Sequence, residues 1–125
     1  MIAGIGTDIT EVRRFEKWVR DPSMLERFFN EKEMSSAKSE ASRCQHYAAR
    51  FAAKEAFSKA LGTGITGFGL KDVYITNDSE GKPLLNIEGA ALSLMKERLG
   101  MCRAFVSLSH EKEYALAFVI LEKGE

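Results

Sequence analysis

Two carboxylates and a lysine have the types and spacing that could bind a metal ion and a phosphate group. Asp8 follows the residues GIGT at the end of an apolar stretch, and Glu55 and Lys59 lie four residues apart in RFAAKEAFSKALGTGI, residues 50–65. Carboxylates, a lysine and backbone amides are the groups that bind Mg²⁺ and a phosphate ester. An unpaired buried carboxylate is costly by several kcal/mol, so Asp8 needs a cation, a helix N-terminus or water.

Each of these residues also has a plainer interpretation. Asp8 can be an acid at the N-terminus of the next helix, stabilised by the helix dipole. Glu55 and Lys59 can be a solvated ion pair, worth only about 0.2–0.5 kcal/mol. At about 100° per residue, Glu55 lies at the border between an apolar stripe and a mostly basic stripe, which fits either interpretation. The basic stripe consists of His46, Arg50, Lys54 and Ser58.

The remaining reactive side chains point to no catalytic triad. His110 lies in SLSHEKEY, at the expected tip of a hairpin, where it is either a surface polar residue or a donor to phosphate. Cys44 and Cys102 are not part of a CxxC pair and lack the spacing of zinc ligands or of a disulfide framework. Because the histidines lack an acidic partner in the sequence, no Ser-His-Asp or Cys-His arrangement can be argued. The carboxylates and their basic neighbours remain as the candidates.

The elements that must position these residues begin with a strand and several helices. Residues 1–12 predict a strand with a turn, and residues 11–20 predict a helix with Thr10 as its N-cap. Asp21-Pro22 should end that helix, and Pro22 suits the first turn of a second, short helix. A long helix is expected from near Ser39 to about Leu61, with Gly62 as its stop.

The second half of the chain predicts a glycine-rich loop, a hairpin, a helix and another hairpin, over residues 62–69, 70–89, 90–100 and 102–123. The whole order is strand, helices, hairpin, helix, hairpin. This order predicts an α+β fold, with an antiparallel sheet packed on one long helix and shorter helices, and argues against a doubly wound α/β fold.

Length and charge set further limits. The chain has 125 residues, which predicts a single domain over residues 1–125. It carries 18 basic and 18 acidic side chains, and this balance argues against a general nucleic-acid or membrane-surface binder. No stretch approaches the roughly 20 apolar residues of a membrane span, and MIAGIG does not open a signal peptide. We therefore expect a cytoplasmic protein with neither nucleic acid nor membrane as a partner.

Three segments together resemble the holo-[acyl-carrier-protein] synthase family, the short-chain type of 4'-phosphopantetheinyl transferases: GIGTDITEVRRF, RFAAKEAFSKALGTGI and SLSHEKEYALAFV. The segment DVYITNDSEGKPLLNIEG also matches the family's hairpin with its GKP turn. The resemblance covers most of the chain, except residues 21–45, which carry no signature. It implies the 4'-phosphopantetheinyl transferase fold. It also implies transfer of the phosphopantetheine arm of coenzyme A to a serine of apo-acyl carrier protein, in support of fatty acid biosynthesis, with release of adenosine 3',5'-bisphosphate.

The same resemblance implies roles for individual residues. Asp8 and Glu55 would bind Mg²⁺, and Lys59 would neutralise the leaving bisphosphate. Glu55, directly or through a metal-bound water, is the first candidate for the base that deprotonates serine, and Asp8 is the second. Coenzyme A contacts are expected at Arg50, Lys59, Gly62, Gly64, Lys82, Pro83 and His110. Of these, Arg50 and His110 would contact phosphates, and the Lys82-Pro83 turn would lie near the adenine.

The resemblance also implies partners. Acyl carrier proteins are acidic, so a basic surface is a suitable docking site, although a plain solvated helix face is the alternative. The candidate docking residues are Arg13, Arg14, Lys17, Arg20, Arg27 and Phe28. Family members are homotrimers with a site at each subunit interface. Two other functions stay open: an acyltransferase that uses a coenzyme A thioester, and a non-catalytic module that binds coenzyme A or a carrier protein.

Overall fold

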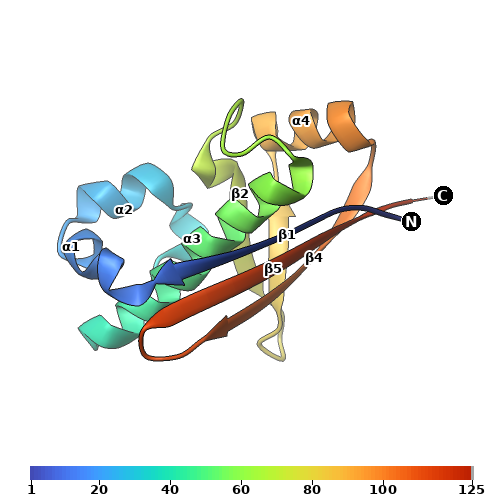
Figure 1. Cartoon of the computed structure of the whole chain (residues 1–125). Coiled ribbons are helices and arrows are strands. Elements are labelled where there is room, and N and C mark those ends of the chain that lie inside the picture. The colour runs from blue at the N-terminus through green and yellow to red at the C-terminus, as the bar shows by residue number, and fades with distance from the viewer. Residues whose placement is uncertain (125) are drawn as a thin grey trace.

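The structure, a computed structural model, describes residues 1–124, and its longest element is the helix α3 (Glu40–Leu61) (Figure 1). The strands are β1 (Ile2–Glu11), β2 (Val73–Asn77), β3 (Pro83–Ile87), β4 (Cys102–His110) and β5 (Tyr114–Lys123). The other α-helices are α1 (Glu16–Val19), α2 (Pro22–Phe28) and α4 (Gly89–Leu99). Three 3₁₀ turns complete the described part: η1 (Val12–Phe15), η2 (Glu31–Glu33) and η3 (Leu70–Asp72).

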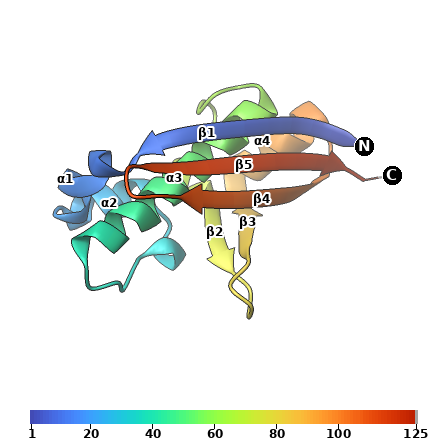
Figure 2. The same cartoon turned by 60° about the horizontal axis from the view of Figure 1, so that its bottom comes forward.

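The strands form two antiparallel sheets. One sheet has three strands in the order β1-β5-β4, and the other is the hairpin β2-β3. In Figure 2 the three strands lie side by side in front of α3, and the hairpin projects from the side of the sheet. The α+β fold with antiparallel strands on one long helix is therefore confirmed. The expected single sheet is divided in two.

Two glycines let β1 approach α3 very closely. A Cβ atom on Gly4 would lie 2.2 Å from the carbonyl oxygen of Ala60, and one on Gly6 would lie 1.9 Å from that of Ala56. No side chain fits at such distances, so only glycine allows this contact. Side chains alternate along a strand, so Asp8 faces the same side as Gly6, toward α3. The pattern GIGTD thus places a carboxylate against a helix.

The core consists of two clusters of buried side chains, and α3 contributes to both. The first lies between the C-terminal half of α3, α4 and the two sheets, and includes Phe57, Leu61, Val73, Met95 and Val119. The second lies between the N-terminal half of α3 and the helices η1 to α2, and includes Phe15, Phe29, Tyr47 and Phe51. Both clusters fix the rotation of α3 about its axis, and with it the direction of Glu55 and Lys59.

The ends of α3 follow the prediction. The Ser39 side chain accepts a hydrogen bond from the Ser42 backbone N–H, and Gly62 has φ of 82°, the left-handed conformation that stops a helix. The start of α2 also agrees, because Asp21 caps it and Pro22 occupies its first turn.

The expected helix over residues 11–20 is wrong in two respects. Its residues form the 3₁₀ turn η1 and the short helix α1, not one helix. Thr10 is not its N-cap, because the β1–β5 ladder continues to Glu11 and Thr10 is paired with Ala115 within it. The expected turn in the first strand is likewise absent from β1, and the strand expected from residue 70 begins at Val73, after η3.

Candidate active site

Asp8, Glu55 and Lys59 come together where β1 crosses the C-terminal half of α3. The Lys59 ammonium Nζ lies 3.2 Å from Asp8 Oδ1 and donates to the Thr7 carbonyl oxygen at 3.0 Å. The Asp8 side chain is only 16% exposed, whereas that of Lys59 is 54% exposed. Lys59 is therefore paired with a carboxylate 51 residues away, and within residues 1–124 it forms no ion pair with Glu55.

The other oxygen of Asp8 is also held. The Thr10 hydroxyl donates to Asp8 Oδ2 at 2.8 Å, and Thr10 is buried at 5% exposure. Asp8 is thus oriented by one hydroxyl and one ammonium, and not by a helix dipole. The same hydrogen bond satisfies the Thr10 hydroxyl, which explains how this polar side chain can be buried on the inner face of β1.

The electrostatics of Glu55 link it to the same cluster. Burial raises the pKa of Glu55, and the nearby Asp8 carboxylate raises it further, while Lys59 and Arg14 lower it. Two carboxylates in one neighbourhood repel each other, and a bound cation relieves that repulsion.

A divalent cation that prefers oxygen ligands fits this pair. Mg²⁺ is bound in proteins by one or two carboxylates, with substrate phosphates and water as its other ligands. In the part of the chain that the structure describes, no group of three or more His, Cys, Asp or Glu side chains lies close enough to hold a metal. The donor set of Asp8 and Glu55 therefore suits Mg²⁺ shared with a phosphate, and not a closed structural site.

Arg50 lies at a second part of the site, beside the β2-β3 hairpin. Its Nη2 donates to Asn77 Oδ1 at 3.4 Å, and Asn77 is paired with Pro83 across the hairpin. Burial lowers the pKa of Arg50, and its Nε is buried without a hydrogen-bond partner. Buried donors in native proteins are almost always satisfied, so this guanidinium is ready for an anion. The structure thus brings Arg50 and the Lys82-Pro83 turn together.

Gly62 and Gly64, two of the expected coenzyme A contacts, lie beyond Lys59, in the loop after α3. The backbone N–H of Gly62 donates to the Lys59 carbonyl oxygen at 3.0 Å. Gly64 has φ of 67°, and a Cβ added to it would have no atom within 4 Å, so its backbone is open to a ligand.

His110 is the last residue of β4, at the tip of the β4-β5 hairpin. In the turn that follows, the Glu111 carbonyl oxygen accepts from Gln45 Nε2 of α3 at 3.5 Å. Among residues 1–124, no hydrogen bond or ion pair connects His110 with Asp8, Glu55 or Lys59. A role beside them within one subunit is therefore not supported by direct contacts.

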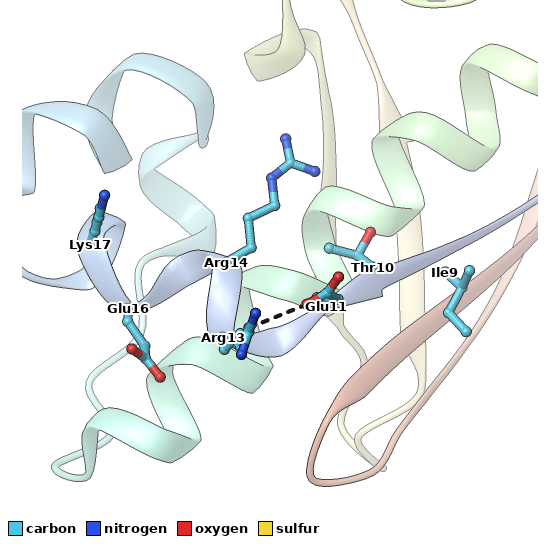
Figure 3. Close-up of a pocket in the computed structure, with 7 residues that line it drawn as sticks. All are labelled: Ile9, Thr10, Glu11, Arg13, Arg14, Glu16 and Lys17. Carbon is cyan, nitrogen blue, oxygen red and sulfur yellow. Dashed lines mark ion pairs between the residues drawn. The ribbon is translucent and has the colours of Figure 1, made fainter.

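The basic residues expected to dock a partner do not share one helix face. Arg13, Arg14 and Lys17 line an open cleft of about 810 Å³ (Figure 3). Arg13 pairs with Glu11 at 3.4 Å, while Arg14 points away from both. The Arg14 guanidinium lies 4.8 Å from the centroid of the Phe51 ring, and it lowers the pKa of the Glu55 carboxyl on the next turn of α3. Arg14 therefore borders both the cleft and the carboxylate site.

Of the other members of that set, Arg20 directly follows α1, and Arg27 and Phe28 lie on α2. Arg20 pairs with Glu40, with 2.6 Å between Nε and Oε1, at the start of α3. Arg27 lies 5.5 Å from the ring centroid of Phe28, and Phe28 in turn contacts Trp18. Their role in docking stays a prediction.

The outer face of the three-stranded sheet carries a row of exposed apolar side chains. Ile9 is 63% exposed and lies opposite Leu116, which is 42% exposed, and Phe118 follows on β5 with 38% exposure. The whole set is Ile5, Ile9, Phe105, Tyr114, Leu116 and Phe118. Large exposed apolar patches are typical of interaction surfaces.

One buried pair was missed by the sequence interpretation. Lys54, expected on a basic stripe at the border of the helix, is 0% exposed, and it binds Glu33, which is 1% exposed. The stripe is therefore not a solvated face, because Ser58 is buried as well. Asn30 followed three residues later by Glu33 is the signature of a capping box, and this signal would have located the turn η2.

An α+β fold with two carboxylates and a lysine near one another, and a partly buried arginine on the same helix, defines a candidate transferase that acts on a phosphate ester. The family model described as the 4'-phosphopantetheinyl transferase superfamily matches residues 4–119, and the chain belongs to this superfamily. The resemblance that the sequence motifs indicated is confirmed.

Individual relatives of the chain support the same family assignment. The chain is 50% identical over 123 residues to a holo-[acyl-carrier-protein] synthase from Treponema denticola, covering 98% of this chain and 99% of that protein. A crystal structure of a holo-(acyl-carrier-protein) synthase from Bacillus anthracis, in complex with CoA (3',5'-ADP), matches with a TM-score of 0.82 and 38% identity over 99% of each chain. The enzyme from Neisseria meningitidis matches with a TM-score of 0.82 and 37% identity, over 98% of this chain and 100% of that one.

Proposed function

We propose that this protein transfers the 4'-phosphopantetheine group of coenzyme A to a serine of apo-acyl carrier protein. The products are the holo-carrier protein and adenosine 3',5'-bisphosphate, and the reaction supports fatty acid biosynthesis. The observation that carries the proposal is the cluster of Asp8, Glu55 and Lys59 between β1 and α3. The relatives named holo-[acyl-carrier-protein] synthase, and the Bacillus anthracis structure with CoA (3',5'-ADP), support it.

The bonds that change define what the site must do. The serine oxygen of the carrier forms a bond to the β-phosphorus of coenzyme A. The bond from that phosphorus to the oxygen bridging it to the α-phosphate breaks, and adenosine 3',5'-bisphosphate leaves with the electron pair. The serine proton must go to a base. In such transfers, positioning and neutralisation of charge provide most of the catalysis.

Glu55 is our first candidate for the base. Burial and Asp8 raise its pKa, which brings a carboxylate closer to the value at which it accepts a proton effectively near neutral pH. Asp8 is the second candidate, although both of its oxygens already accept hydrogen bonds. We propose that Lys59 moves from Asp8 to the leaving bisphosphate, which its exposed side chain permits.

The same proposal includes a Mg²⁺ ion held by Asp8 and Glu55. When bound, this ion would neutralise the diphosphate and polarise the phosphorus under attack. We propose that Arg50 and His110 bind other phosphates of coenzyme A, that Gly62 and Gly64 lie along it, and that Lys82-Pro83 lies near the adenine. The buried, unpartnered Nε of Arg50 supports the first of these assignments.

We further propose a homotrimer with an active site at each subunit interface. The exposed apolar face of the three-stranded sheet supports it, because a monomer would leave this face in water. Such an arrangement also offers His110 of one subunit a route to the Asp8 site of its neighbour, which direct contacts within one chain do not provide.

We propose that the carrier protein docks on the cleft near Arg13, Arg14 and Lys17, with Arg20, Arg27 and Phe28 at its margin. Electrostatic attraction to an acidic partner would speed the encounter. A single domain over residues 1–125 and a cytoplasmic location remain part of the proposal. In residues 1–124, no helix is long and apolar enough to span a membrane.

A mass-shift assay tests the proposed function. Apo-acyl carrier protein is incubated with the protein, coenzyme A and Mg²⁺, and we expect a mass gain of one phosphopantetheine that EDTA abolishes. A thioester-dependent acyltransferase would instead add an acyl group from acyl-coenzyme A and would ignore EDTA. A binding module would bind coenzyme A in calorimetry without release of the bisphosphate. If none of a panel of carriers is modified, the proposal is wrong.

A further inference from the structure

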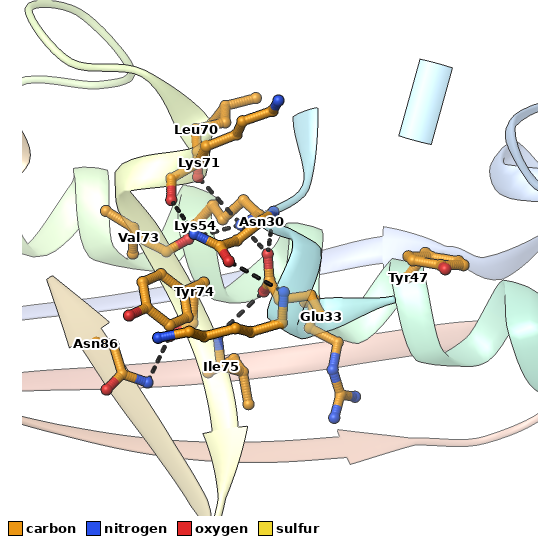
Figure 4. A network of polar contacts seen from close by, with 12 residues as sticks. Asn30, Glu33, Tyr47, Lys54, Leu70, Lys71, Val73, Tyr74, Ile75 and Asn86 are labelled. Atoms are coloured by element: carbon orange, nitrogen blue, oxygen red, sulfur yellow. Dashed lines mark hydrogen bonds and ion pairs between the residues drawn. The ribbon is translucent and has the colours of Figure 1, made fainter. Parts of the chain in front are cut away.

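The buried ion pair between Lys54 and Glu33 lies at the centre of a polar network that the proposed reaction does not use (Figure 4). The Lys54 ammonium is 2.6 Å from Glu33 Oε1, and it also donates to the carbonyl oxygens of Val73 at 2.6 Å and Leu70 at 3.1 Å. An ammonium has three donor hydrogens, so all of its capacity is used. Burial lowers the pKa of Lys54, and Glu33 opposes that change.

The Glu33 carboxylate is equally well satisfied. Its Oε1 accepts from the Asn30 backbone N–H at 3.1 Å, and its Oε2 accepts from the Ile75 N–H at 3.0 Å. The ring of His46 contacts the Glu33 carbonyl oxygen, and burial lowers the pKa of that imidazole to about 4, so it is neutral. The network therefore joins η2, α3, η3 and β2 through directional bonds.

These bonds set the distance between α3 and the β2-β3 hairpin. Arg50 lies one helical turn before Lys54 on the same stripe of α3 and contacts Asn77. Asn77 lies two residues beyond Ile75 on β2 and faces Pro83. Lys54 and Glu33 thus hold β2 in register with the helix that carries Arg50, and β2 in turn positions the Lys82-Pro83 turn through the pairing of Asn77 with Pro83.

Stability alone does not explain this pair. Apolar side chains of similar size often stabilise a core as well as a buried ion pair does, or better. An apolar contact, however, is not directional, whereas an ammonium bound to two fixed carbonyl oxygens admits one arrangement. The pair is therefore better suited to fixing a geometry than to stabilising the fold.

We infer that Lys54 and Glu33 are positioning residues for the nucleotide end of coenzyme A, which they serve by fixing the β2-β3 hairpin against Arg50. This inference rests on the proposed function. It separates the two ends of the site: disturbing the pair weakens coenzyme A binding, while the chemistry at Asp8 and Glu55 proceeds.

The test compares steady-state kinetics of the double variant Glu33→Leu/Lys54→Met with those of the wild type. We expect KM for coenzyme A to rise about tenfold, the size of one lost charge-assisted hydrogen bond, with kcat changed by less than about threefold. Calorimetry with coenzyme A alone should show the same loss of affinity. KM for the carrier protein should stay the same.

A matched control separates positioning from general loss of stability. Val19→Ala removes part of a buried side chain of α1, in the core cluster that contains no residue of the hairpin, and it should lower the melting temperature without changing KM for coenzyme A. An unchanged KM in the double variant, or an equal rise in Val19→Ala, overturns the inference. If the double variant does not fold, the comparison is made on Glu33→Gln, which keeps the size of the side chain. A wild type that modifies no carrier refutes the proposed function instead.

Discussion

Gly6→Ala tests the contact that places Asp8 against α3. The added Cβ would lie 1.9 Å from the Ala56 carbonyl oxygen and 2.8 Å from the Ala60 nitrogen. Side-chain Cβ atoms do not approach other atoms within 3.0 Å, so β1 and α3 must separate by about 1.1 Å, the difference between 3.0 and 1.9 Å. The helix backbone cannot rotate aside, as a flexible side chain would, and so the displacement passes to neighbouring residues of β1.

Two consequences follow from this displacement. Overpacking costs about 1–3 kcal/mol, and a contact with backbone belongs at the upper end of that range. About 3 kcal/mol corresponds to a fall of roughly 10 °C in the melting temperature of a domain of this size. Asp8, two residues further along β1, would move away from Lys59 and Glu55. Because a misplacement of about 1 Å can cost about a hundredfold in rate, the transfer rate should fall by one to two orders of magnitude.

Differential scanning calorimetry and the carrier mass-shift assay, run below the melting temperature of both proteins, measure these effects. Gly69→Ala is the matched control, because Gly69 has φ of −89° and an added Cβ meets no atom within 4 Å. It should be neutral or slightly stabilising. A Gly6→Ala protein with the stability and rate of the wild type would refute the close approach of β1 and α3.

Three further predictions concern the charges of the site and the exposed sheet face. Lys59→Met removes the cation beside Asp8, so Mn²⁺ binding without coenzyme A, followed by electron paramagnetic resonance, should tighten several-fold while transfer slows; weaker binding would contradict the ion pair. The pKa of Glu55 is higher in the native state than in the unfolded chain, so the native state binds more protons. Glu55 therefore lowers the free energy of unfolding as the pH rises above its pKa in the unfolded chain. Glu55→Gln should therefore melt above the wild type at about pH 7, with a difference that shrinks toward about pH 4, and a lower melting temperature at neutral pH would argue against the shift. Phe118→Asp should convert a trimer to monomers in sedimentation velocity with an unchanged circular dichroism spectrum, and a monomeric wild type would contradict the proposed assembly.

Local signals in the sequence were sufficient for most of the fold. The limits of α3 followed from a serine cap and a left-handed glycine, both of which act within a few residues. The first helix was not predicted correctly, because its start depends on how far β1 remains paired with β5, and that pairing joins residues more than 100 positions apart. The same reasoning explains why Thr10 was misassigned.

In the candidate site, too, local signals are readable from the sequence and long-range contacts are not. Residue types and motifs single out Asp8 and Glu55 as candidate site residues, and their roles stay a prediction, but these signals do not give the ion-pair partner of Lys59. Helical spacing favours Glu55 as that partner, and only the contact of β1 with α3 brings Asp8 closer. The burial of Lys54 was likewise hidden, since a lysine on a polar stripe gives no sign of a glutamate 21 residues earlier that folds over it.

The most direct test of the central claim measures both products of one reaction. Holo-carrier protein is quantified by mass spectrometry, and adenosine 3',5'-bisphosphate by chromatography, with wild type, Asp8→Ala and Glu55→Ala, each with and without EDTA. The account predicts one bisphosphate for each carrier modified by the wild type, and neither product with EDTA or from folded variants. Full product formation by both variants, or transfer that persists in EDTA, would contradict it.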